Sequence, residues 1–337
     1  MDIKTVKESF RIRNNENLKK ISGLLEQRWG SPYRTYRENW KKANLLCVHT
    51  DFPIHMDLDT IDACNLHCLY CTEEHGFIRS RTKKQMPQEL LEGVFKEVEN
   101  PAGKDRLCSV SIGTLGEPFL FPEKVFFILE KCRKAGVMEK FIRTNGLLLT
   151  PEVYKKILDF DLTYLFCSID AIKPETYRLM RGNDLHKVID NILGLIEFKR
   201  KKNAVFPVIR VSFLETKENL AERDEFIKFW KDKVDIIDIQ SPIDYIHDSS
   251  SASKISYTCE QPFVRVGIGV EGQIGLCCAG YIMLASFFDW IFPEISIYEA
   301  WNSSKAGSLR KAMKEKDFVN FPDCFKCLSR YSRNINV

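Results

Sequence analysis

Three cysteines lie close together in the stretch CNLHCLYC, at positions 64, 68 and 71. No fourth cysteine is near them in the sequence, although metal sites built from cysteine usually close with four ligands. Three thiolates on one short loop can hold three corners of a four-iron four-sulfur cluster and leave one iron without a protein ligand. The alternative is a zinc ion with His67 or His75 as the fourth ligand. Because zinc sites favour paired C-x2-C spacings, the spacing of Cys64, Cys68 and Cys71 favours the iron–sulfur cluster.

A second group of cysteines follows residue 258. Cys259 is followed after twelve residues by Gly272, and after four more by Cys277. A C-x2-C pair, Cys324 and Cys327, comes later. Two ligands from a hairpin and two from a C-x2-C loop predict a closed metal site, for which spacing alone leaves zinc and iron–sulfur open. The isolated cysteines are expected to be small core or near-core residues: Cys47, Cys108, Cys132 and Cys167.

The elements that must position these cysteines form a regular pattern from residue 54 to 240. Six strand-like runs, IHMDLDTI, CSVSIG, KFIRT, LTYLFCSI, PVIRVSFL and DIIDIQ, alternate with helix-like stretches. The helix-like stretches begin near Pro87, Pro122, Pro151, Pro174 and Asn219. This alternation predicts an α/β fold with a parallel sheet covered by helices, either an open partial barrel or a doubly wound sheet. The three-cysteine loop directly follows the first strand, at the carboxyl end where ligands gather in such folds.

The rest of the chain divides into two further parts. Residues 1–50 are expected to be a helical N-terminal extension with a break at Gly30, ahead of a barrel over residues 51–245. Polar residues 247–254 are expected to be a linker into a smaller C-terminal domain over residues 246–337. That domain is predicted to contain a β-hairpin with its turn at Glu271-Gly272, an apolar insert over residues 281–295 and a helix around Ile297 to Lys314.

Composition excludes several classes of protein. The chain has 337 residues, 44% of them hydrophobic, which is enough for a full core and about two domains. The first twenty residues lack the apolar segment of a signal peptide, and no apolar run reaches the about 20 residues that span a membrane, so we expect a cytoplasmic protein. The mild net charge of +4 predicts a mixed-charge surface, with no nucleic-acid and no membrane partner. Twelve cysteines without a secretion signal indicate metal or redox chemistry.

The C-x3-C-x2-C loop, with aromatic Tyr70 before its last cysteine, resembles that of the radical S-adenosylmethionine (SAM) superfamily. The resemblance implies a partial six-unit β/α barrel in which the amino and carboxylate groups of SAM bind the open iron. Further stretches agree in order along the chain: Gly116-Glu117-Pro118, Thr144-Asn145-Gly146, Ser168-Ile169-Asp170 and Tyr177-x3-Arg181-Gly182. By this resemblance the SAM-binding residues are Tyr70, Gly116, Glu117, Asn145, Ser168, Arg181 and Leu214. Singly, each of these motifs is as well explained by a turn or a solvated helix end.

The resemblance also implies a chemistry. A reduced cluster gives one electron to SAM, and the resulting 5'-deoxyadenosyl radical removes a hydrogen atom from an unactivated C–H bond. The protein holds the substrate against the radical and excludes water. The expected partners are a small-molecule or peptide substrate and a flavodoxin- or ferredoxin-type electron donor.

The pattern C-x12-G-x4-C, together with the stretch Ser296-Ile-Tyr-Glu-Ala-Trp301-Asn, resembles the SPASM/twitch extension of radical SAM enzymes. This extension carries auxiliary four-iron four-sulfur clusters. With four or five cysteines the chain fits the shorter, twitch-like version with one cluster, whose ligands are then Cys259, Cys277, Cys324 and Cys327. A fully ligated cluster suits electron transfer, so we expect a two-electron oxidation of a sugar-like, cyclitol or other small metabolite.

Three alternatives remain open. One is a peptide- or protein-modifying enzyme that forms thioethers, epimerises residues or matures a protein. Another is a redox-neutral epimerase in which Cys278 donates a hydrogen atom. Alternatively, Cys278 is a spare buried thiol or an alternative ligand of the cluster. The last is a metal-stabilised binding protein without catalysis. The apolar insert is expected to be core, or a lid or partner surface.

Overall fold

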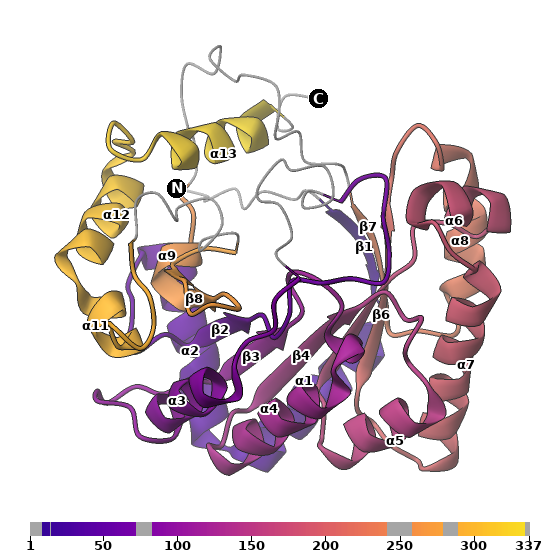
Figure 1. Ribbon diagram of the computed structural model, residues 1–337, viewed down its shortest axis with the longest axis horizontal. Helices are drawn as coiled ribbons and strands as arrows, with labels where there is room; N and C mark the ends of the chain where they lie inside the picture. Colours follow the sequence, from indigo (N-terminus) through magenta and orange to yellow (C-terminus); the bar gives the residue numbers. More distant parts are fainter. Residues whose placement is uncertain (1–8, 14, 72–82, 241–257, 279–288, 334–337) are drawn as a thin grey trace.

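The computed structural model describes residues 9–13, 15–71, 83–240, 258–278 and 289–333 (Figure 1). Within these residues nine strands form one sheet, in the order β1-β7-β6-β5-β4-β3-β2-β8-β9. Strands β2 to β7 are parallel to their neighbours, β8 is parallel to β2, and the outer strands β1 and β9 are antiparallel to theirs. The strands are β1 (Ser9–Arg13), β2 (His55–Leu58), β3 (Ser109–Ile112), β4 (Glu139–Thr144), β5 (Tyr164–Ser168), β6 (Val208–Leu214), β7 (Ile236–Gln240), β8 (Arg265–Ile268) and β9 (Ile274–Gly275).

The six predicted strands are confirmed as β2 to β7, in consecutive order across the open sheet. Helices follow them around the outside of the sheet (Figure 1). Before residue 240 the helices are α1 (Asn15–Trp29), α2 (Ser31–Leu46), α3 (Gln88–Glu99), η1 (Pro118–Leu120), α4 (Pro122–Lys134), α5 (Pro151–Asp159), α6 (Pro174–Arg181), α7 (Leu185–Lys201), η2 (Leu220–Glu222) and α8 (Arg223–Trp230). Pro122, Pro151 and Pro174 occupy the first helical turn, where the lacking N–H costs nothing. The alternation of parallel strands and helices matches the expected partial barrel.

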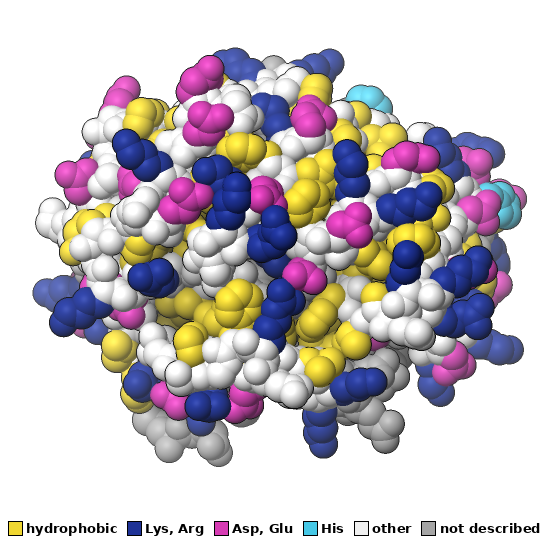
Figure 2. Space-filling model, turned by 90° about the horizontal axis from the view of Figure 1, so that it is seen from below, with side chains coloured by type: hydrophobic (Ala, Val, Ile, Leu, Met, Phe, Trp, Pro, Cys, Tyr) yellow, Lys and Arg dark blue, Asp and Glu magenta, His cyan; other side chains and the backbone are white. Residues whose placement is uncertain are grey.

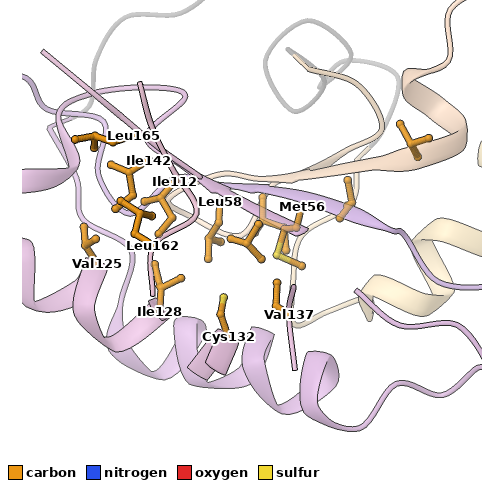
Figure 3. Close-up of a cluster of buried hydrophobic side chains, with 14 of the residues drawn as sticks. Met56, Leu58, Ile112, Val125, Ile128, Cys132, Val137, Ile142, Leu162 and Leu165 are labelled. Carbon is orange, nitrogen blue, oxygen red and sulfur yellow. The ribbon is translucent and has the colours of Figure 1, made fainter. Parts of the chain in front are cut away.

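The core lies between the outer face of the sheet and its covering helices. Figure 3 shows Val125, Ile128 and Cys132 of α4 pointing toward strand residues such as Leu58 and Ile142. All five side chains are fully buried. Each apolar side chain buried in this way is worth about 1.5–3 kcal/mol relative to an exposed one. The expectation that Cys132 and Cys167 are core residues is confirmed, and Cys47 and Cys108 are half-buried.

The inner face of the same strands is polar. Side chains alternate along β2, so that Met56 and Leu58 join the core while His55 and Asp57 face the interior of the barrel. There the His55 Nδ1 atom lies 2.7 Å from the hydroxyl oxygen of Ser109. Asp57 is buried and forms an ion pair with Arg265 of β8, whose side chain is 12% exposed. The outer layer therefore stabilises the fold, and the inner face is free to carry polar chemistry.

The N-terminal extension differs in part from its prediction. Residues 9–13 form strand β1 on the edge of the sheet beside β7, so the expected helix is wrong for this segment. The two helices α1 and α2 and the break at Gly30 are confirmed. Helix α2 packs against the sheet through Tyr36, whose hydroxyl donates to the buried carboxylate of Glu139 at 2.7 Å. The extension therefore contributes to the barrel directly.

The C-terminal part contains the expected hairpin, formed by β8 and β9 with a turn around Gly272. Gly272 has φ of +86°, and a Cβ there would lie 2.3 Å from the carbonyl oxygen of Phe292, so both backbone and space require glycine. The helices are α9 (Gln261–Val264), α11 (Ile297–Asn302), α12 (Ser304–Glu315) and α13 (Pro322–Arg333). The single helix expected around Ile297 to Lys314 is thus two helices, broken at Ser303, whose hydroxyl caps α12.

One correction concerns the C-terminal cysteine pair. Cys324 and Cys327 lie on helix α13, not on a loop as predicted. The expected linker over 247–254 and residues 281–288 of the apolar insert lie outside the described residues. The boundaries at residues 50 and 245 stay predictions. No helix among the described residues is long and apolar enough to cross a membrane. The face seen in Figure 2 intersperses basic and acidic side chains.

Candidate active site

The three-cysteine loop leaves the carboxyl end of β2 and is held there by neighbouring elements. The amide of Leu69 donates to the carbonyl of Met180 at the end of α6, at 2.9 Å. The exposed Tyr70 donates its hydroxyl to Glu218 at 2.7 Å, beyond the end of β6. The amide of Glu117, beyond the end of β3, donates to the carbonyl of Ala63 at 2.8 Å. The loop is therefore fixed from several sides of the sheet edge.

Beside this loop lies a cavity of about 250 Å³, which we call the first cavity. It contains the three cysteines and all seven residues that the sequence resemblance assigned to SAM. Their roles stay predictions, but the fold brings them to one place from five strand ends. The lining residues are Cys64, Leu66, Cys68, Tyr70, Cys71, Gly113, Thr114, Leu115, Gly116, Glu117, Arg143, Thr144, Asn145, Ser168, Asp170, Met180, Arg181 and Leu214.

Gly116 lets the chain after β3 approach the cysteine loop closely. Its φ is +63°, and a Cβ would lie 2.5 Å from the carbonyl oxygen of Ala63 and 2.6 Å from that of Ile61. Any other residue would push the two segments apart. This close approach forms one wall of the first cavity.

Glu117 is buried, and its carboxylate is directed to the end of β4. It accepts hydrogen bonds from the Thr144 hydroxyl at 2.7 Å and from the Asn145 amide at 2.8 Å. Burial raises the pKa of Glu117 to about 7, and the hydrogen bonds from Asn145 and Thr144 oppose that rise. The Glu117 side chain thus connects the ends of β3 and β4. Because its carboxylate is used for these contacts, the backbone of Gly116-Glu117-Pro118 is the part of this motif available to a cofactor.

Asn145 connects β4 to the cysteine loop. Its side-chain amide donates to Asn65 at 2.8 Å and lies 3.8 Å from the sulfur of Cys64. An amide donor directed at a thiolate stabilises the negative charge of that thiolate. Asn145 therefore both orients the loop and places an amide donor beside the sulfur of Cys64.

Arg181 performs the same task for Cys68. Its guanidinium forms a buried ion pair with Asp170, and Nη1 lies 3.6 Å from the sulfur of Cys68. Burial raises the pKa of the Cys68 thiol, and the Arg181 charge opposes that rise. Nε of Arg181 is buried and has no hydrogen-bond partner among the described residues. The sequence placed Arg181 at SAM, whereas its nearest contacts here are Asp170 and Cys68.

Sequence reasoning missed several residues of the first cavity, above all Arg143, Thr114 and Asp170. Arg143 lies on β4 in the run KFIRT, where alternation with the buried Ile142 was the available signal that it faces inward. Of the proposed zinc ligands, His67 is exposed and does not line the first cavity, while His75 lies outside the described residues. Within the described stretches, no three His, Cys, Asp or Glu side chains form a group that suits a single metal ion.

A smaller cavity of about 60 Å³, the second cavity, lies among the C-terminal cysteines. The structure brings together the four predicted ligands and Cys278, although they come from three separate segments. Burial raises the pKa of Cys259 well above its usual value, and the neighbouring Cys278 adds to the rise. The lining residues are Cys259, Gln261, Pro262, Cys277, Cys278, Met313, Asp323, Cys324, Cys327 and Leu328.

Cys278 lines the second cavity and is an exposed residue that lies near Arg265 of β8. Desolvation by the surrounding protein atoms raises the pKa of its thiol, while the nearby positive charge of Arg265 opposes the rise. Arg265 is ion-paired with Asp57, which also lies 3.4 Å from Arg143 of the first cavity. A series of charged groups, Arg265, Asp57 and Arg143, thus connects the neighbourhood of Cys278 with the first cavity.

Comparison with protein families gives one match, to the model described as the radical SAM superfamily, over residues 58–229. The match begins at the last residue of β2 and includes the cysteine loop and every residue named above that lines the first cavity.

Among curated proteins, the chain is 30% identical over 139 residues to the uncharacterized protein MJ0804 of Methanocaldococcus jannaschii, covering 41% of this chain and 42% of that protein. It is 31% identical over 151 residues to GTP 3',8-cyclase of Alkaliphilus oremlandii, covering 43% and 45%. It is 27% identical over 176 residues to the mycofactocin maturase MftC of Mycolicibacterium smegmatis, covering 52% and 41%. Each match spans less than half of the relative's own length.

Solved structures share the fold. SuiB of Streptococcus suis, bound to its precursor peptide SuiA, superposes with a TM-score of 0.59 at 15% identity, covering 83% of this chain and 70% of SuiB. The structure of anSMEcpe with bound AdoMet and the Cp18Cys peptide gives a TM-score of 0.58 at 18% identity, covering 77% and 83%. At these sequence identities, the superpositions show a shared arrangement of helices and strands and nothing about function.

Proposed function

Because the chain belongs to the radical SAM superfamily, we propose that it removes a hydrogen atom from a C–H bond of a substrate bound beside the first cavity. The observation that carries this proposal is the convergence of three cysteines and the polar strand ends on one cavity of about 250 Å³. We assign Cys64, Cys68 and Cys71 as ligands of a four-iron four-sulfur cluster, and the remaining walls of the cavity to SAM.

The residues present fit these groups. Three thiols supply the soft donors that iron–sulfur clusters require. Nη1 of Arg181 and the side-chain amide of Asn145 are donors directed at the thiols, and the buried Nε of Arg181 has no hydrogen-bond partner among the described residues. When bound, the cluster and SAM supply a one-electron reductive cleavage and a hydrogen-atom abstraction.

The chain's own residues have three tasks in this proposal. Arg181 and Asn145 stabilise the negative charge of Cys68 and Cys64 through contacts of 3.6 and 3.8 Å. Glu117 holds the ends of β3 and β4 together. Gly116 lets the segment after β3 close against the loop, which helps to exclude water from the reaction.

For the second cavity we propose a closed auxiliary cluster with Cys259, Cys277, Cys324 and Cys327 as ligands. The four thiols line one cavity together, although they come from three separate segments of the chain. A cluster without an open iron suits acceptance of an electron from the substrate radical, so the net reaction is a two-electron oxidation of a small metabolite. A flavodoxin- or ferredoxin-type protein is the proposed electron donor.

A second candidate is modification of a peptide or protein. It is favoured by the 27% identity to the mycofactocin maturase over 52% of this chain. The two candidates share the chemistry of the first cavity and differ in the substrate. A third, redox-neutral epimerisation with Cys278 as hydrogen-atom donor, predicts solvent deuterium at a substrate carbon that is lost in Cys278→Ala.

The proposed function is tested by anaerobic reconstitution with iron and sulfide. We expect about eight iron ions per chain, four for each cluster, and formation of 5'-deoxyadenosine from SAM that requires a reductant. Zinc in place of iron, with no cleavage of SAM, would refute the proposal and favour a metal-stabilised binding protein. Variants of Cys108, a half-buried cysteine outside both cavities, serve as the matched control.

A further inference from the structure

Arg143 is held by only one end of its guanidinium group. Nη1 donates to the Ser111 hydroxyl at 2.6 Å and to the Thr114 hydroxyl at 3.2 Å, and lies 3.4 Å from the Asp57 carboxylate. These groups come from β2, β3 and the segment after β3, so three neighbouring segments hold Nη1 of Arg143 in place. The residue also lines the first cavity.

The opposite edge of the same guanidinium is open. Among the described residues, Nε and Nη2 of Arg143 have no hydrogen-bond partner, and the side chain is 36% exposed. These two nitrogens form the planar fork that binds a carboxylate or a phosphate through two parallel hydrogen bonds. The edge available to a ligand is thus the one suited to an anion.

Arg143 shares its only carboxylate partner among the described residues with a second arginine. Asp57 is a single carboxylate that faces both Arg143 and Arg265. Burial lowers the pKa of the adjacent His55 to about 4, so His55 is neutral near pH 7. The other arginine of the first cavity, Arg181, is balanced by Asp170. An anionic ligand at Arg143 would supply the second carboxylate or phosphate partner that Asp57, shared with Arg265, does not provide.

We propose that the Nε–Nη2 edge of Arg143 binds an anionic group of the substrate, a carboxylate or a phosphate. This inference rests on the proposed function and narrows its substrate to a molecule that carries such a group. Arg143 lies on the side of the first cavity nearer the second, because Asp57 connects it to Arg265 and that arginine lies beside Cys278.

The test measures binding of two simple anions, inorganic phosphate and acetate, to the reconstituted, SAM-loaded protein by equilibrium dialysis. We expect saturable binding of at least one of them by the wild type. Affinity is expected to fall by about tenfold or more in Arg143→Gln and by less in Arg143→Lys, which keeps the charge but loses the fork. Thr114→Val, which removes one of the contacts that hold Nη1, should give a smaller loss. Arg133→Gln, an exposed arginine on α4, should bind as the wild type does.

Three results would overturn the inference. One is anion binding that is equal in the wild type and Arg143→Gln, which would make it an adventitious ion only. Another is the absence of saturable binding of either anion by the wild type. The third is a tenfold loss of SAM affinity in Arg143→Gln with anion binding retained, because Arg143 would then hold the carboxylate of the cofactor.

Formation of 5'-deoxyadenosine is measured on the same samples. If the wild type forms no 5'-deoxyadenosine, the proposed function is refuted. If the wild type cleaves SAM but its anion binding does not depend on Arg143, only the inference about the substrate is refuted. Thermal unfolding of each variant identifies any that fail to fold, and Thr114→Val, a milder change, supports the same comparison.

Discussion

The two cysteine-lined cavities differ in size, surroundings and origin. The first measures about 250 Å³ and lies among polar strand ends, with a buried Arg–Asp pair and a side-chain amide directed at its cysteines. The second measures about 60 Å³ and has apolar walls that include Met313 and Leu328. Its thiols come from α13 and from the segments before α9 and after β9.

This difference indicates that the cysteines of the two cavities serve different purposes. A cavity with room beyond its cysteines, lined by donors and acceptors, suits a cluster with a bound cofactor and substrate. A small apolar cavity with more cysteines than the first suits a cluster that is closed by protein ligands and shielded from solvent, conditions that govern its potential. The ion pair of Asp57 and Arg265 interacts with Arg143 of the first cavity and with Cys278 of the second, which gives the two sites a shared electrostatic environment.

The largest expected effect comes from exchanging one cysteine in each cavity. In Cys68→Ala we expect the iron content to fall by about four ions and 5'-deoxyadenosine formation to fall to background, since the cluster that cleaves SAM is lost. In Cys327→Ala we expect a similar loss of iron, while reductant-dependent cleavage of SAM persists and substrate oxidation is lost. Iron quantitation and chromatography of 5'-deoxyadenosine measure both.

Cys108→Ala is the control, because Cys108 is half-buried and lies outside both cavities. The division of labour between the cavities would be wrong if Cys327→Ala abolished cleavage of SAM and Cys68→Ala did not.

The next effect concerns the buried ion pair of the first cavity. Arg181→Gln leaves the carboxylate of Asp170 buried without its partner, which we expect to lower the free energy of unfolding by about 3–5 kcal/mol. It also removes the charge beside Cys68, so cleavage of SAM should slow. Denaturant unfolding and the rate of 5'-deoxyadenosine formation are the measurements. The double variant Asp170→Asn with Arg181→Gln should recover part of the stability but not the rate; full recovery of both would contradict a role toward Cys68.

The sequence predicted the layout of the barrel well and the edges of the fold less well. Strands β2 to β7 were found because apolar runs alternate with helices that begin at prolines, a signal each segment carries by itself. Strand β1, with the sequence SFRIR, alternates polar and apolar residues, but it lies outside the regular series of strands and helices and pairs with β7 far along the chain. Helix α13 was expected to be a loop because the C-x2-C pair was interpreted through metal-site spacing, although Pro322 stands at a helix start.

The candidate site shows the same limit. Its cysteines and the motifs at the strand ends were identifiable from order along the chain. Arg143 was not, because its importance arises from three partners on β2, β3 and the following loop, which no local pattern brings together. The contact of Arg181 with Cys68 likewise depends on how the end of α6 meets the cysteine loop.

A smaller effect is expected at Glu117, whose pKa is raised to about 7 from an ordinary value of 4.5. Between these two values the folded protein binds more protons than the unfolded chain, so the contribution of Glu117 to stability is present below pH 4.5 and is lost as pH rises through 7. The loss is up to about 3 kcal/mol, since one pKa unit corresponds to about 1.36 kcal/mol. Denaturant unfolding at pH 5, 6 and 7 should therefore show a shallower decline in Glu117→Gln than in the wild type. Parallel curves would contradict the raised pKa.

The smallest effect tests whether the second cavity can be loosened without disturbing the first. Ser303 caps α12 by accepting from the Ala306 amide at 3.1 Å, and α12 carries Met313 of the second cavity. Ser303→Ala should lower the free energy of unfolding by about 1 kcal/mol, and Ser303→Asp, which keeps a capping oxygen, should cost less. Cleavage of SAM should be unchanged in both, because neither change reaches the strand ends that line the first cavity. A fall in cleavage of SAM with Ser303→Ala would mean that the two cavities do not act separately. The ion pair of Asp57 and Arg265 would then be the connection between them.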